Sequence, residues 1–139
     1  MSTALYVPML SLMLLTMIVW LWMYIKRISY IQTNKIDPQS AASRVGLLKV
    51  LPDEVQAPAN NLNNLLELPI IFYALCLLNS QQPHVGHTLL YLAWTYVGLR
   101  ALHSVIHCTY NKVMHRFSVY FLSSVVLWAM LVLTLVSVM

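Results

Sequence analysis

LYVPMLSLMLLTMIVWLWMYI, at residues 5–25, is the stretch that decides the class of this fold. It contains no charged side chain and ends directly at a Lys-Arg pair. A helix that crosses the hydrocarbon core of a bilayer needs roughly 20 mostly apolar residues. Trp20, Trp22 and Tyr24 gather near its end, as aromatic side chains do where a span reaches the membrane surface. No basic residue precedes the run, so we interpret it as a retained span rather than a cleaved secretory signal.

Three more segments have the composition of membrane spans, at residues 60–79, 88–108 and 116–138. The chain as a whole is 60% hydrophobic and only 9% charged, which leaves too few polar residues to cover a soluble core. We therefore predict an all-α integral membrane protein, with one four-helix transmembrane domain over residues 1–139. Two cysteines fall inside predicted spans, where we expect them to pack as small apolar groups and not as a disulfide.

The basic residues predict the topology. All eight lie in two zones: Lys26, Arg27, Lys35, Arg44 and Lys49, then Arg100, Lys112 and Arg116. Because Lys and Arg are retained on the cytoplasmic side of short loops, both zones are predicted to be cytoplasmic and both termini to lie outside. The long polar segment at residues 28–58 is then a cytoplasmic loop, with a short interfacial helix near residues 40–49. Topology and contact with membrane lipids account for the net charge of +4, so we expect no nucleic-acid partner.

The second span carries polar side chains that a lipid-facing helix would avoid. Asn60, Asn64 and Glu67 follow at i, i+4 and i+7, which places them on one helical face. Asn63, four residues before Glu67, broadens this stripe. Pro69 comes next and removes a backbone donor, so a kink is predicted there.

The third span carries Arg100, His103 and His107 at i, i+3 and i+7. Buried cations in a span need a partner, and Glu67 is the only acidic residue in any predicted span, so we predict a Glu67–Arg100 pair. Such a pair could serve only to hold two helices together. The two histidines have a spacing that suits a metal, but no third ligand accompanies them, and we predict no metal site.

Arg116 and Tyr120 share a face at the start of the fourth span. A basic residue and an aromatic residue at a membrane surface are ordinary features of a span. Taken alone, these two residues are therefore compatible with a purely topological role.

Two stretches carry a family resemblance: NNLNNLLELPIIFY at residues 60–73 and VGLRALHSVIHCTYNKVMHRF at residues 97–117. Both resemble the MAPEG family, the membrane-associated proteins in eicosanoid and glutathione metabolism, and most of all its bacterial branch. The resemblance implies a homotrimer of four-helix bundles in the bacterial inner membrane. It also implies that glutathione binds between neighbouring subunits near the cytoplasmic face, where an Arg lowers the pKa of its thiol. A lipophilic electrophile or hydroperoxide would then reach the thiolate from the bilayer.

The resemblance also implies roles for individual residues. Arg116 matches the Arg that activates the thiol and is the candidate catalytic residue. The candidate binding residues are Asn60, Asn64, Glu67, Arg100, His103, His107 and Tyr120. A cation beside a thiol favours the nucleophilic thiolate, so the implied role of Arg116 agrees with its chemistry.

The chain departs from the family pattern at three positions. Two of them are candidate binding residues, and the third, Asn63, lies beside Asn64. Asn60 and Asn63 stand where glutathione-using members carry basic residues, and His107 stands where many eicosanoid enzymes have a Tyr. Two functions therefore remain open. One is a glutathione or other thiol transferase or peroxidase that acts on lipophilic substrates. The other is a non-catalytic lipid-binding protein or accessory subunit of a membrane complex with the same fold.

Overall fold

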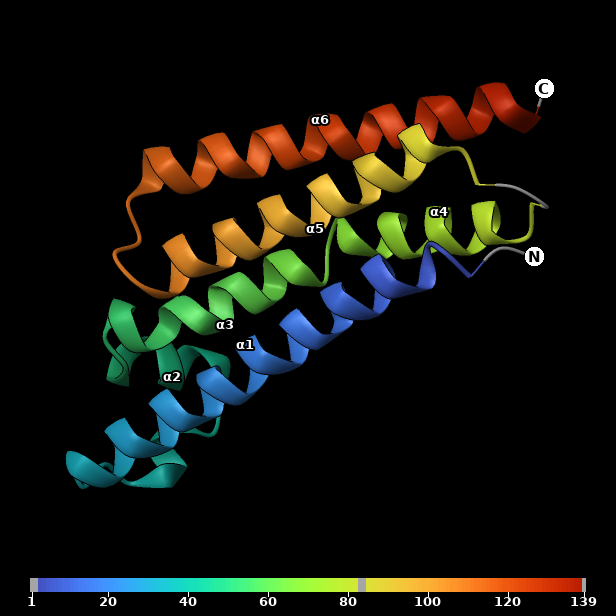
Figure 1. Cartoon of the computed structure of the whole chain (residues 1–139). Helices are drawn as coiled ribbons and strands as arrows, with labels where there is room; N and C mark the ends of the chain where they lie inside the picture. Colours follow the sequence, from blue (N-terminus) through green and yellow to red (C-terminus); the bar gives the residue numbers. More distant parts are fainter. Residues whose placement is uncertain (1–2, 83–84, 139) are drawn as a thin grey trace.

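Four long helical segments lie side by side in the computed structural model, which describes residues 3–82 and 85–138 (Figure 1). No strand occurs in these two ranges. The elements in chain order are α1 (Tyr6–Thr33), the 3-10 turn η1 (Pro38–Ala41), α2 (Arg44–Val50), α3 (Asp53–Leu65), α4 (Pro69–Ser80), α5 (His87–Cys108) and α6 (Val113–Val138). Helices α3 and α4 follow one another and form one span over Asp53–Ser80. All four spans are long and apolar enough to cross a membrane, as predicted.

Both described ends of the chain lie at one end of the bundle, together with the connection from α4 to α5 (Figure 1). Helix α2 and the turn between α5 and α6 lie at the opposite end, which we call the basic end. Lys49 lies there in the last turn of α2, Lys35 follows the end of α1, and Lys112 lies in the α5–α6 turn. The two basic zones of the sequence therefore meet at the same end of the fold.

The first connection is shorter than the sequence predicts. Helix α1 continues to Thr33, and α3 begins at Asp53, so that both ends of the segment that the sequence predicts as a loop are helical. Asp53 and Glu54 occupy the first turn of α3, where carboxylates interact favourably with the helix dipole. The helix then runs through Pro58, which lies buried inside α3.

A short helix does occur near residues 40–49, as predicted. Its first turn is capped by Ser43, whose Oγ accepts a hydrogen bond from the Gly46 amide at 3.0 Å. Val45 and Leu48 of this helix are exposed, so α2 turns apolar side chains away from the bundle.

The second span breaks at residues 66–68, between α3 and α4. Pro69 is the first residue of α4, and it has no N–H to offer the carbonyl of Leu65. The kink predicted at Pro69 is thus confirmed, in the form of an interruption of the helix. The Leu66 N–H still donates to the carbonyls of Leu62 and Asn63, but the break leaves the carbonyl of Asn64 available to a group from another helix.

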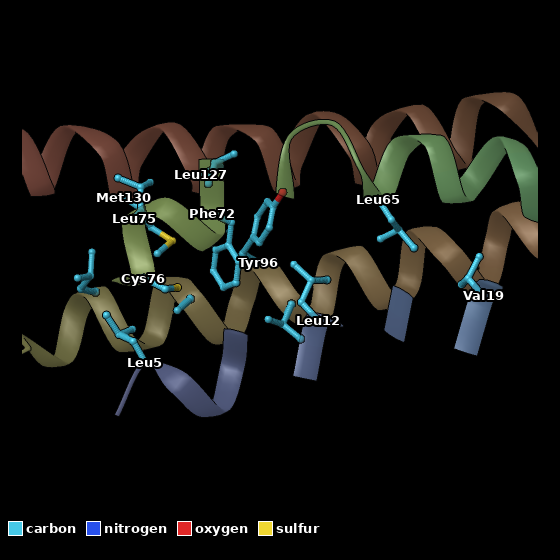
Figure 2. Close-up of a cluster of buried hydrophobic side chains, with 13 residues drawn as sticks. Leu5, Leu12, Val19, Leu65, Phe72, Leu75, Cys76, Tyr96, Leu127 and Met130 are labelled. Carbon is cyan, nitrogen blue, oxygen red and sulfur yellow. The ribbon is translucent and has the colours of Figure 1, made fainter. Parts of the chain in front are cut away.

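The apolar core lies between the spans and is formed by buried side chains of α1, α3, α4, α5 and α6, together with Leu5 (Figure 2). Phe72 of α4 stacks on Tyr96 of α5 with ring centroids 4.7 Å apart. Leu12 of α1 and Leu127 of α6 are fully buried near them. Both cysteines are free, and Cys76 is buried in this cluster, as predicted. Because lipid is as apolar as these side chains, burying them gives little hydrophobic stabilisation. This core therefore stabilises the bundle through close packing between helices.

Candidate functional site

A pocket of about 350 Å³ opens at the basic end between α3, α5 and α6. Its walls are Asn60, Asn64, His103, His107, Val113, Arg116, Phe117 and Tyr120. We call it the α6 pocket. The structure therefore brings together six of the predicted site residues, from α3 and from the consecutive helices α5 and α6. The other two predicted residues, Glu67 and Arg100, do not line it.

Arg116 is held in place from one side. Its Nη1 donates to the Asn111 side-chain oxygen at 2.8 Å and to Nε2 of His107 at 3.0 Å. An arginine cannot accept a hydrogen bond, so Nε2 of His107 is the acceptor and its proton lies on Nδ1. Within the described part of the chain, the Nε and Nη2 groups of Arg116 have no partner. The guanidinium is thus oriented and still has donors for a ligand.

The ring of His103 contacts the backbone of Arg116. Its Nδ1 lies 3.0 Å from the carbonyl oxygen of Arg116. A carbonyl only accepts, so Nδ1 is the donor and Nε2 is left as an acceptor in the neutral ring. That Nε2 is buried and finds no partner among residues 3–82 and 85–138. The rings of His103 and Tyr120 lie 5.7 Å apart, which joins α5 to α6 beside the pocket.

Arg100 lies behind the pocket wall and is fully buried. Its Nη2 donates to the backbone carbonyl of Asn64 at 2.8 Å. Its guanidinium carbon lies 5.0 Å from the ring centroid of Tyr120 and 5.7 Å from that of Tyr96. Arg100 is therefore stabilised by two aromatic rings and by a carbonyl that the helix break has released, while its Nε and Nη1 are buried without a hydrogen-bond partner in the described chain.

The predicted Glu67–Arg100 ion pair is absent from the described chain. Glu67 lies in the break between α3 and α4 and is exposed. The periodicity argument assumed a continuous helix, in which Glu67 would share a face with Asn64. Because the helix ends at Leu65, Glu67 does not follow that face, and the carbonyl of Asn64 takes its place as the partner of Arg100.

Asn60 and Asn64 form the α3 wall of the pocket. The side-chain amide of Asn64 donates to the Asn60 carbonyl at 3.2 Å. This bond orients Asn64, while the backbone of the same residue holds Arg100. The α3 wall is consequently polar and uncharged.

Asn111 is a site residue that the sequence reasoning missed. It lies in the α5–α6 turn with φ of 48°, and its backbone N–H donates to the Ile106 carbonyl at 2.8 Å. Asn is one of the few residues other than glycine that adopt this left-handed conformation readily. An Asn five residues before a candidate Arg, in the short turn that follows a predicted span, is the signal that could have identified it.

Family comparison agrees with this geometry. The model of the MAPEG family matches residues 5–136, which is nearly the whole chain. The chain belongs to the MAPEG family. A search of curated proteins and a search of solved structures returned no match. The resemblance noted in the sequence is thus confirmed, and this MAPEG protein is an integral membrane protein with four helices that can span a bilayer.

Proposed function

We propose that the α6 pocket binds glutathione or a related thiol and activates it for reaction with a lipophilic substrate. The observation that supports this most directly is the orientation of Arg116. His107 and Asn111 hold one of its nitrogens, and the remaining donors are available at a pocket wall. A fixed guanidinium beside a thiol stabilises the thiolate relative to the thiol.

The reaction follows from the nucleophilicity of the thiolate. Its sulfur forms a bond to an electrophilic carbon, and the leaving group departs with the bonding electron pair. With a hydroperoxide, the sulfur instead attacks the terminal oxygen and the O–O bond breaks, which yields an alcohol and a sulfenic acid. A second thiol then reduces the sulfenic acid to a disulfide and water.

Access from the lipid is consistent with the rim of the pocket. Val113 and Phe117 of α6 line it and are each about 60% exposed. Side chains of this kind on the outside of a span face lipid. A lipophilic substrate would enter past them, while the polar thiol compound occupies the side formed by Asn60, Asn64 and Arg116.

We further propose that the protein works as a homotrimer in a bacterial inner membrane, with the basic end in the cytoplasm. The proposal rests on the family and on the meeting of both basic zones at one end of the bundle. Glu67 is exposed within a span in the single chain, and a second subunit would cover it.

Calorimetry of glutathione binding to the purified protein in detergent tests the proposal. Arg116→Ala should weaken binding by about tenfold, the effect of losing one charge-assisted hydrogen bond. Lys112→Ala is the matched control, because Lys112 is a nearby exposed cation outside the pocket. No binding of millimolar glutathione to the unaltered protein would contradict the proposal.

One observation favours the alternative of a non-catalytic lipid-binding protein or accessory subunit. Arg116 is the only charged side chain among the pocket walls, whereas glutathione carries two carboxylates. A neutral amphiphile would suit such a pocket. In that case Arg116→Ala would change neither thiol binding nor turnover, and lipids or protein partners that co-purify would identify the function.

A further inference from the structure

A second pocket at the basic end lies between α1, α2 and α3 and has a volume of about 280 Å³. Its walls are Met23, Arg27, Leu47, Leu48, Gln56, Ala59, Asn60, Leu62 and Asn63. We call it the α2 pocket. It adjoins the α6 pocket at Asn60, which lines both, but it contains none of the histidines, tyrosines or arginine of the proposed thiol site.

Arg27 is the only charged residue of the α2 pocket, and it has no partner in the described chain. Its side chain is half-buried and its Nε is fully buried without a hydrogen bond. Asp53 and Glu54, the acidic residues at the start of α3, are exposed and do not pair with it. Arg100 also has buried donors without a partner, but it lies inside the bundle, whereas Arg27 lines a pocket that a ligand can enter. Buried donors in proteins are nearly always bonded, so the unbonded Nε at this pocket wall points to an acceptor from outside the chain.

The rest of the polar wall consists of amides. Gln56 is buried, and its Nε2 donates to the Leu51 carbonyl at 2.6 Å, which fixes the orientation of the side chain. Asn60 and Asn63 add exposed amides on the next turns of α3. One cation surrounded by neutral amides, with no carboxylate in the wall, suits a ligand that bears a single negative charge.

The opposite wall is apolar. Met23 is buried there, and Leu47 and Leu62 are half-buried beside it. Leu48 lines the pocket and is 58% exposed, so the wall continues onto the outer face of α2. A ligand that fills this site would therefore carry hydrocarbon next to its negative group.

We propose that the α2 pocket binds the headgroup of an anionic phospholipid, with the phosphodiester on Arg27 and an acyl chain along Leu47 and Leu48. A phosphate group accepts the parallel donors of a guanidinium, and basic pockets between membrane helices bind anionic headgroups. The same anion chemistry could come from free phosphate, but the apolar wall has a use only for a lipid. This inference goes beyond the proposed thiol chemistry and does not depend on it.

Native mass spectrometry of the purified protein in detergent provides the test, with no thiol present. Phosphatidylglycerol and phosphatidylcholine with identical acyl chains are added separately. Phosphatidylglycerol should bind more tightly than phosphatidylcholine, and Arg27→Ala should weaken the binding of phosphatidylglycerol by about tenfold. Lys49→Ala is the matched control, an exposed cation on α2 outside the pocket, and should change binding less than about twofold.

Further variants keep the test independent of folding defects. Arg27→Gln conserves the length and polarity of the side chain and should lose the same preference as Arg27→Ala. Leu48→Ala alters an exposed side chain and should weaken the binding of both lipids to the same extent. Equal binding of the two lipids, or phosphatidylglycerol binding that survives both Arg27 variants, would overturn the proposal. Binding of inorganic phosphate without phosphatidylglycerol would overturn the choice of a lipid.

Discussion

Asn111 acts on the candidate site through both its backbone and its side chain. The left-handed backbone closes the α5–α6 turn, and the side-chain oxygen holds Nη1 of Arg116. The two contributions can be separated, because glycine accepts the same backbone conformation without a side chain.

Asn111→Gly is expected to weaken glutathione binding about fivefold while the protein remains folded, since one hydrogen bond to a charged group is lost and the turn is kept. Calorimetry and melting in detergent measure the two effects. Lys35→Gly is the matched control, because Lys35 also has positive φ, at 50°, but lies after α1 and outside the pocket. Unchanged glutathione binding in Asn111→Gly would show that Arg116 needs no support from Asn111.

Arg100 shows how a buried cation can be held without a carboxylate. Two tyrosine rings and the carbonyl of Asn64 surround it, and Glu67 does not contact it in the described chain. The aromatic contribution depends on the face of the ring and not on the phenol oxygen.

Tyr120→Phe should therefore leave stability unchanged, while Tyr120→Leu should lower the free energy of unfolding by about 1–2 kcal/mol, because the second variant removes the ring beside Arg100. Thermal melting in detergent compares the two variants. Equal melting temperatures for Phe and Leu at position 120 would argue against a cation–π contribution.

The break between α3 and α4 decides the geometry at the level of elements. It interrupts the polar stripe of the second span and releases the carbonyl that Arg100 uses. Pro69 is its chemical cause, since it cannot donate to Leu65.

Pro69→Ala supplies the missing N–H, so the helix should close across residues 66–69 and backbone amides there should exchange with solvent more slowly. Hydrogen–deuterium exchange in detergent measures this. Pro8→Ala is the control, because Pro8 lies in the first turn of α1, where an N–H has no intrahelical acceptor. Unaltered exchange at residues 66–70 in Pro69→Ala would mean that packing, and not proline, maintains the break.

At the scale of the whole molecule, the fold places both basic zones at one end and both described chain ends at the other (Figure 1). An even number of spans produces this arrangement, and the placement of Lys and Arg predicts which end is cytoplasmic.

Single cysteines at Lys35 and Lys112, in a chain with Cys76 and Cys108 replaced by alanine, should react with an impermeant thiol reagent only from the cytoplasmic side. A cysteine at Gln82, in the connection after α4, should react only from the other side. Labelling of intact cells and of inverted vesicles makes the comparison. The reverse pattern would show that the basic end faces outward.

The sequence alone determined the membrane class, the family and which residues of α5 and α6 share a face. Hydrocarbon thickness and helical periodicity act locally, so Arg100, His103, His107 and Arg116 could be recognised without a structure. Helix ends were less predictable: α1 extends to Thr33 and α3 starts at Asp53, within the segment at residues 28–58 that the sequence predicts as a loop.

Only the tertiary structure decided which polar groups meet. Periodicity placed Glu67 on the face of Asn64, but the break at residues 66–68 ends that face, and the carbonyl of Asn64 became the partner of Arg100. The role of Asn111 likewise depends on a turn that brings its side chain to Arg116. Local patterns fix a residue's direction only while the helix continues, so contacts made across breaks and turns require the three-dimensional arrangement of the chain.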